Sequence, residues 1–171
     1  MTTTLLQRLD QAARYAAPAA ITLFVVLLGV VPIHAPFYPA IAPMLVLMPV
    51  YFWTVHRPDL LPFPVTFAAG LLHDALTGAP LGLHAIVLLF CQGVVLTQRR
   101  FLAGKSFFVL WWGFLFTVVV ATTLEWVLFG LYHAAAMPAE PVAFKALLTT
   151  ALFPLPAWLF SHTQRSLLSG S

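Results

Sequence analysis

The sequence predicts an all-α protein, a polytopic membrane helical bundle of about six transmembrane helices with short loops. Of its 171 residues, 61% are hydrophobic and only 8% are charged. An average soluble domain carries roughly 25% charged residues. The charged residues are therefore too few to cover a surface exposed to water, and most of the surface must face lipid. The eight basic residues are scattered, without the stripe that is typical of nucleic-acid binding.

The apolar runs divide at prolines, glycines and charges into six predicted spans. These are residues 17–33, 40–55, 61–77, 83–97, 107–132 and 142–162. Several are shorter than the roughly 20 residues that cross a bilayer upright. Local thinning of the bilayer and a re-entrant third segment are therefore open alternatives. Three prolines fall within spans and are expected to kink the helices: Pro49, Pro154 and Pro156.

Basic residues predict the orientation of the spans. If the N-terminus is cytoplasmic, seven basic residues lie inside: Arg8, Arg14, Arg57, Arg99, Arg100, Lys105 and Arg165. Only Lys145 lies outside. An odd number of spans would place Arg165 outside, so we expect both termini in the cytoplasm.

Three regions are predicted on this basis. Residues 1–16 form an amphipathic cytoplasmic segment at the membrane surface, residues 17–162 the six-helix domain, and residues 163–171 a cytoplasmic tail. No cleavable signal peptide is evident, so we expect the first apolar segment to remain as an anchor.

Asp74 is an ionisable residue within the third span. Gly70, Asp74 and Gly78 are spaced by four and share one helical face, where the glycines let another backbone come close. The turn from Gly78 to Gly82 reverses the chain and brings the N-terminus of the next helix beside Asp74. Its free N–H groups can hold the carboxylate. We interpret Asp74 as the residue that holds this hairpin together; the alternative is a proton or ligand site.

Glu125 is the second ionisable residue within a span, and its partner could be His73, His84, a backbone turn or another protein's helix. Four histidines are expected on the outer side: His34, His73, His84 and His133. With the two carboxylates they could form a metal or proton-relay cluster, but no pair has ligand spacing. We interpret them as separate polar tips near the aqueous surface, and expect no metal and no cofactor.

Other chemistry is not indicated. The single cysteine, Cys91, is expected to be a small buried or lipid-facing hydrophobe. The sequence contains no recognisable nucleophile–base set, phosphate-binding glycine loop or redox-ligand pair. We therefore expect no catalytic residues and no enzyme.

The stretch Gly70-Leu-Leu-His-Asp74, followed by Thr77-Gly-Ala-Pro-Leu-Gly-Leu-His84, resembles the signature of the rod shape-determining protein MreD family. Gly70, Asp74, Gly78, Pro80 and Gly82 match the family motif, whereas His73 stands where many members have an aliphatic residue. The upstream stretch from Pro43 to Trp53 is similar to the family's second span.

The resemblance implies a non-catalytic scaffold of the bacterial cell-wall elongation complex, in the inner membrane, that maintains rod shape. The implied partners are an MreC-like bitopic membrane protein and the complex of RodA with a class B penicillin-binding protein, and indirectly MreB filaments. The face of Gly70 and Gly78 is a plausible contact for a partner helix. The family's fold is said to be similar to the substrate-binding subunits of energy-coupling-factor vitamin transporters. The alternative is therefore a small-molecule, vitamin-like binding subunit, with a cavity around Asp74, Glu125 and the kinked sixth span.

Overall fold

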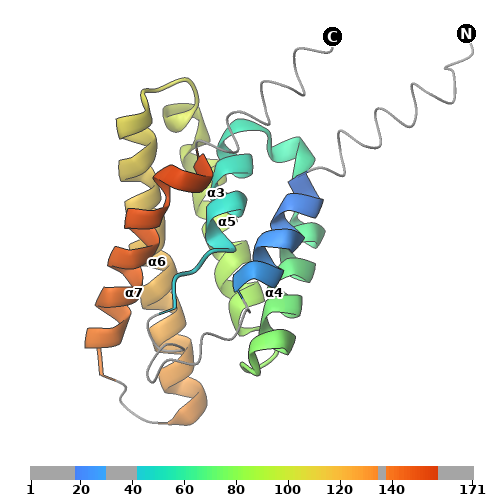
Figure 1. Ribbon diagram of the computed structural model, residues 1–171, viewed down its shortest axis with the longest axis vertical. Coiled ribbons are helices and arrows are strands. Elements are labelled where there is room, and N and C mark those ends of the chain that lie inside the picture. Colours follow the sequence, from blue (N-terminus) through green and yellow to red (C-terminus); the bar gives the residue numbers. More distant parts are fainter. Residues whose placement is uncertain (1–17, 30–41, 135–137, 158–171) are drawn as a thin grey trace, which may run out of the picture.

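The computed structural model describes residues 18–29, 42–134 and 138–157, and every regular element in these ranges is helical. The elements are a helix Pro18–Gly29, α3 (Leu47–His56), the short 3-10 helix η1 (Pro58–Leu60), α4 (Phe63–Thr77), α5 (Leu83–Leu102), α6 (Phe107–His133) and α7 (Glu140–Leu152). The helices lie side by side along the long axis of the molecule (Figure 1). For the described residues, the predicted all-α class is confirmed.

Three of the predicted spans correspond closely to observed helices. α4 and α6 differ from the predicted ranges by one or two residues, and α5 continues to Leu102, beyond the predicted end at residue 97. α5 and α6 are long and apolar enough to cross a membrane. At 1.5 Å per residue, α5 extends about 30 Å and α6 about 40 Å. The predicted segments 1–16 and 163–171 lie outside the described residues.

The second predicted span, residues 40–55, is wrong in its first half, because α3 begins only at Leu47. Before it, the backbone N–H of Met44 donates to Oγ1 of Thr149 on α7, 3.0 Å away. Irregular backbone is tolerated at membrane depth where other parts of the protein bury it, and here a side chain from another helix supplies the partner. Pro49 lies in the first turn of α3, where a missing N–H costs no helical hydrogen bond, so it does not interrupt the helix.

The sixth predicted span is interrupted where its prolines stand. α7 ends at Leu152, Phe153 is in a turn, and a second helical segment begins at Pro154. Pro154 has no N–H to donate, so the helical hydrogen bonding is interrupted there, while Phe153 itself keeps helical angles (φ −54°, ψ −37°). In Figure 1 the red segment accordingly turns away from the axis of α7. The kink expected from Pro154 and Pro156 is thus a break in the helix.

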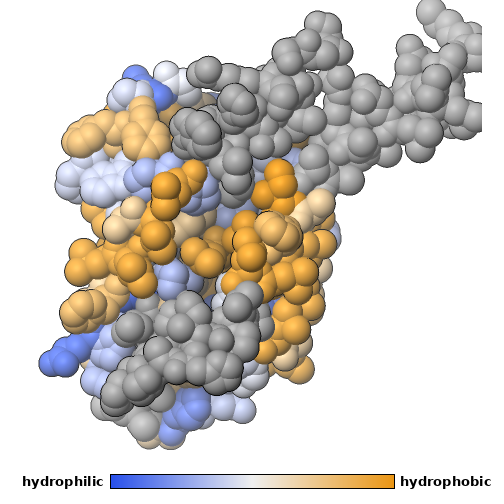
Figure 2. Space-filling view, viewed as in Figure 1, coloured by the Kyte–Doolittle hydropathy of each residue, from blue (hydrophilic) through white to orange (hydrophobic). Residues whose placement is uncertain are grey.

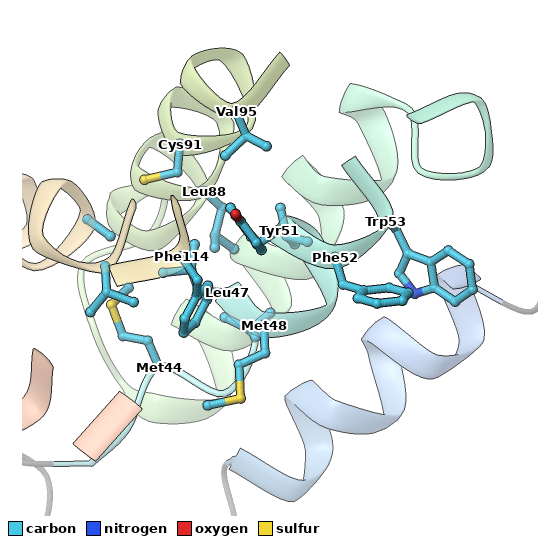
Figure 3. Packing of buried hydrophobic residues seen from close by; sticks show 14 of the residues in the cluster. Met44, Leu47, Met48, Tyr51, Phe52, Trp53, Leu88, Cys91, Val95 and Phe114 are labelled. Carbon is cyan, nitrogen blue, oxygen red and sulfur yellow. The ribbon is translucent and has the colours of Figure 1, made fainter. Parts of the chain in front are cut away.

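The core of the bundle is built around α3, whose residues 47–55 are all buried. Tyr51 meets the ring of Phe114 edge to face, with centroids 5.2 Å apart (Figure 3). Phe114 also stacks on Phe153, with centroids 3.9 Å apart. The hydroxyl of Tyr51 donates to the carbonyl of Leu110, 2.9 Å away. These contacts join α3 to α6 and to the break after α7. Cys91 is 1% exposed, as expected for a small hydrophobe.

The two ends of the bundle differ in their charged residues. At one end, Nε of Arg99 donates to the carbonyl of Val55, 3.3 Å away, next to Arg57. The connection between α5 and α6 lies at this end, where the helix Pro18–Gly29 begins and the red segment ends (Figure 1). We call it the basic end, and the other, with the α4–α5 turn, the turn end. Between them, apolar residues cover much of the surface seen in Figure 2.

Candidate functional site

The turn between α4 and α5 is shaped by two glycines with positive φ. Gly78 ends α4 at φ +71°, and Gly82 begins α5 at φ +95°. Residues with a Cβ atom rarely adopt such angles, whereas glycine does so without steric cost. Pro80 lies between them, and its carbonyl accepts the N–H of Leu83 at 3.1 Å. The turn therefore reverses the chain within a few residues and brings the start of α5 beside the end of α4.

Asp74 is fully buried and makes hydrogen bonds to both sides of this turn. Its Oδ2 accepts the backbone N–H of Gly82 at 2.8 Å, and its Oδ1 accepts the backbone N–H of His84 at 3.1 Å. Its own carbonyl accepts the N–H of Ala79 at 3.2 Å. The first N–H groups of α5 have no partner within their own helix, and their positive dipole end favours an anion. The carboxylate of Asp74 thus caps α5 from the neighbouring helix.

Gly70 lies one turn before Asp74, at the closest approach of α4 and α5. A Cβ atom at Gly70 would lie 2.4 Å from the Cα of Ala85 and 2.7 Å from its backbone nitrogen. The face of Gly70 is therefore occupied by α5 of the same chain. At Gly70 this overturns the expectation of contact with a partner helix, because the hairpin itself fills the groove that the small residue leaves. At Gly78 no atom lies within 4 Å of an added Cβ, so the expectation stays a prediction there.

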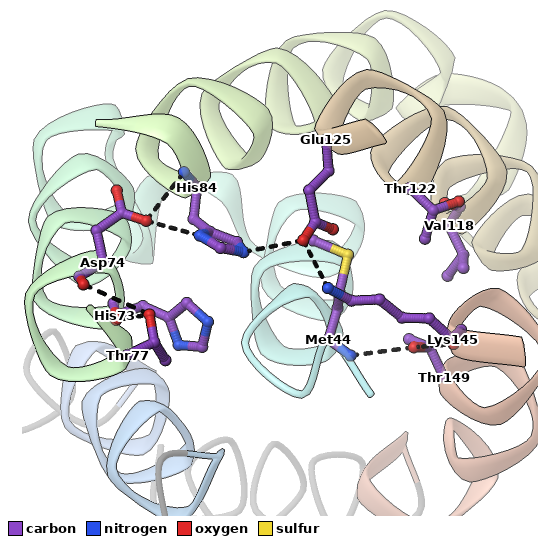
Figure 4. Close-up of polar contacts among 10 residues, drawn as sticks. All are labelled: Met44, His73, Asp74, Thr77, His84, Val118, Thr122, Glu125, Lys145 and Thr149. Atoms are coloured by element: carbon purple, nitrogen blue, oxygen red, sulfur yellow. Dashed lines mark hydrogen bonds and ion pairs between the residues drawn. The ribbon is translucent and has the colours of Figure 1, made fainter. Parts of the chain in front are cut away.

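The side chain of His84 extends the contacts of Asp74 to two further helices (Figure 4). Its Nδ1 lies 2.6 Å from Oδ1 of Asp74, and its Nε2 lies 3.3 Å from Oε1 of Glu125 on α6. The same Oε1 accepts a hydrogen bond from Nζ of Lys145 on α7, 2.6 Å away. We call Asp74, His84, Glu125 and Lys145 the polar quartet. One residue comes from each of α4, α5, α6 and α7, so the quartet links all four helices.

The histidines do not behave alike. His84 is 6% exposed and bridges two carboxylates, so its interpretation as a separate polar tip is wrong. His73 meets its ring edge to face, with centroids 4.6 Å apart, and Nδ1 of His73 is buried without a hydrogen-bond partner in the described part of the chain. His133 is exposed and bonds only locally, to Phe129, as a polar tip would. His34 lies outside the described residues.

Lys145 is the member of the quartet that the sequence analysis did not place at the site. It stood out only as the single basic residue on the predicted outer side. That position was itself a signal, because Glu125 falls in the second half of the preceding predicted span and a short connection brings the two helices together. Lys145 departs from the rule that basic residues gather on the cytoplasmic side, and its pairing with the carboxylate of Glu125 explains this departure.

No group of three or more metal-ligating side chains with suitable geometry occurs within residues 18–29, 42–134 and 138–157. A separate groove of about 480 Å³ lies between the helix Pro18–Gly29, the start of α3 and the break after α7. It is lined by apolar side chains, which include Phe24, Met48 and Leu155. Neither Asp74 nor Glu125 lines it. The two carboxylates are used in the quartet instead, and a cavity that combines them with the kinked sixth span stays a prediction.

The motif predicted from the sequence lies in this hairpin, with its glycines, proline and aspartate each in a defined structural position. No curated protein and no solved structure matches the chain. The family model described as rod shape-determining protein MreD matches residues 13–163, nearly the whole chain. The chain therefore belongs to the MreD family of membrane proteins, which act in determining rod shape.

Proposed function

We propose that this protein is a non-catalytic scaffold of the cell-wall elongation complex, a multi-pass protein of the bacterial inner membrane. The family match over residues 13–163 is the observation that carries the proposal. The proposed partners are an MreC-like bitopic protein and the complex of RodA with a class B penicillin-binding protein, with MreB filaments connected indirectly.

The use of the polar groups supports a scaffold rather than an enzyme. The carboxylates of Asp74 and Glu125 are taken up by contacts between helices of the same chain. Large apolar side chains are exposed instead, among them Phe108 at 65% and Trp112 at 51%. Such surfaces are suited to lipid and to the apolar helices of other membrane proteins.

The proposed topology has six spans with both termini in the cytoplasm. It is supported by Arg57, Arg99, Arg100 and Lys105, which belong to connections at the basic end or to helix ends beside them. Lys145 is at a distance from this end, paired with Glu125. Excess basic charge favours the cytoplasmic side, so the basic end is assigned to the cytoplasm and the turn end to the periplasm. The division into residues 1–16, 17–162 and 163–171 forms part of the proposal.

Depletion tests the proposal. In a rod-shaped host, loss of the protein should produce rounded cells, and the tagged protein should co-purify with an MreC-like protein in mild detergent. A matched pair of alleles sharpens the test: Gly70→Leu, which disrupts the hairpin, should fail to restore rods, whereas Gly93→Ala, at an open position, should restore them. Rod-shaped cells after complete depletion would contradict the proposal.

Small-molecule binding is a second candidate, favoured by the groove of about 480 Å³, a volume within the range of ligand pockets. Its apolar lining suits an apolar ligand more than a charged vitamin. A thermal-shift screen of the purified protein in detergent tests it, because a ligand that binds the folded state stabilises it by mass action. A saturable rise in melting temperature that is lost in Met48→Trp, which fills the groove, would favour this function. No rise with any compound would favour the scaffold.

A further inference from the structure

The hydrogen atoms of the polar quartet can be counted from its geometry. Both ring nitrogens of His84 face carboxylate oxygens, Nδ1 towards Asp74 at 2.6 Å and Nε2 towards Glu125 at 3.3 Å. A neutral imidazole has one N–H donor and one bare acceptor nitrogen. A bare nitrogen facing a carboxylate oxygen is repelled by it unless a hydrogen lies between them. Both contacts therefore require a hydrogen, which gives two on the line from Asp74 through His84 to Glu125.

The charge of the quartet leads to the same count. Two ionised carboxylates and one lysine ammonium leave one negative charge, which a second hydrogen on this line cancels. The side chains of the four residues are between 0% and 13% exposed. An uncompensated charge is strongly unfavourable in such a site, whereas an electroneutral group is not.

Within the part of the chain that the structure describes, the neighbouring elements supply no other charge to this site. On α4 the remaining titratable neighbour is His73, which contacts the ring of His84 edge to face. α3 packs against α5 without an acid or a lysine or arginine in its range Leu47–His56, and its histidine, His56, is at its other end. On α6 and α7 the facing groups are Glu125 and Lys145 themselves. The net charge of the site is therefore determined by the four residues of the quartet.

We propose that the quartet is a proton-binding site: one proton, bound through His84 between Asp74 and Glu125, makes it electroneutral and holds α5 and α6 together at the turn end. These two helices are joined covalently only at the basic end, through residues 103–106. At the turn end the contact of His84 with Glu125 is the polar link between them. Loss of the bound proton leaves two acceptors facing each other and breaks this link. The inference does not depend on the scaffold function.

A set of charge-balanced variants tests the proton count. Glu125→Gln and Lys145→Gln each leave the proton-loaded quartet with one net charge, and the double variant restores neutrality. Glu140→Gln and Lys105→Gln, at exposed positions, are the matched controls. The readout is the labelling rate, at one pH in detergent, of the native thiol of Cys91, which is 1% exposed on α5 and seven residues from His84. Opening between α5 and α6 exposes this thiol to a small maleimide.

Lys145→Gln should raise the labelling rate at least about tenfold, because an unbalanced buried charge favours the open state. Glu125→Gln can restore neutrality by releasing the bound proton, so it should label no more slowly than wild type. The double variant should fall back towards the wild-type rate, and both controls should stay within about twofold of it. A Glu125→Gln rate clearly below wild type, with a raised Lys145→Gln rate, would show that the line holds one hydrogen and overturn the proposal. So would an unchanged Lys145→Gln rate, or a double variant as fast as Lys145→Gln.

If a variant does not fold, the proposal can be tested by a measurement on the unmodified protein. Amide hydrogen exchange of the turn ends of α5 and α6, corrected for the intrinsic effect of pH, should become faster in alkali, because loss of the bound proton breaks the link between the two helices. Protection that is constant across pH, or that rises steadily into alkali, would refute the proton-binding site.

Discussion

Replacing Gly70 with alanine tests the packing of the hairpin most simply. The added Cβ would lie 2.4 Å from the Cα of Ala85, whereas ordinary carbon–carbon contacts are about 3.5–4.0 Å. The obstacle is backbone, so no side-chain rotation relieves it, and α4 and α5 must move apart by roughly 1 Å. Such overpacking costs about 1–3 kcal/mol and occasionally more. The displacement also lengthens the hydrogen bonds of Asp74, one turn away.

We therefore expect Gly70→Ala to lower the free energy of unfolding by about 2 kcal/mol, the upper end of the overpacking cost less the roughly 1 kcal/mol by which alanine favours a helix over glycine. For a chain of this length, that corresponds to a fall in melting temperature of about 4–8 °C. The matched control is Gly93→Ala on α5, where no atom lies within 4 Å of the added Cβ. It should melt at or above the wild-type temperature. Both are measured by thermal unfolding in the same detergent, and a Gly70→Ala protein that melts with the wild type would refute the close approach.

Three further substitutions test the polar contacts and the turn by the same melting assay. Asp74→Asn should cost about 1–3 kcal/mol, because asparagine has one acceptor oxygen and cannot satisfy all the N–H groups that Asp74 accepts. Asp74→Leu should cost more, since every one of those donors loses its partner; equal stability of the two variants would argue against the capping role. Gly82→Ala, at φ +95°, should cost about 1–2 kcal/mol, and an unchanged melting temperature would mean that the turn adopts other angles. Tyr51→Phe should cost about 1 kcal/mol through the lost hydrogen bond to Leu110, and no loss would show that this bond is absent in the folded protein.

The hairpin could be predicted in detail because its determinants are local in sequence. The spacing of Gly70, Asp74 and Gly78 fixes a shared helical face, and Gly78 and Gly82 meet the positive φ angles of the turn. An aspartate one turn before such a reversal necessarily lies near the next helix N-terminus. The same locality explains why α4 and α6 end close to their predicted positions.

The remaining features depend on contacts between distant residues. Hydropathy alone extends the second span to residue 40, but the helix starts at Leu47, since Thr149 on α7 satisfies the N–H of Met44. The pairing of Glu125 with Lys145 joins consecutive spans whose relative depth hydropathy does not give. Charge rules place residues on a side of the membrane and do not say which of them meet.

The topology we propose is a bundle that crosses the membrane with its turn end outside and its basic end in the cytoplasm. Single-cysteine labelling in intact cells, in a Cys91→Ala background, measures this orientation. An impermeant maleimide should label a cysteine at Leu81, in the exposed α4–α5 turn, and should label one at Ser106, in the α5–α6 connection, only after the cells are permeabilised. A cysteine at Ser169 should behave like that at Ser106. Labelling of both connections from the same side, or of Ser169 from outside, would contradict this topology.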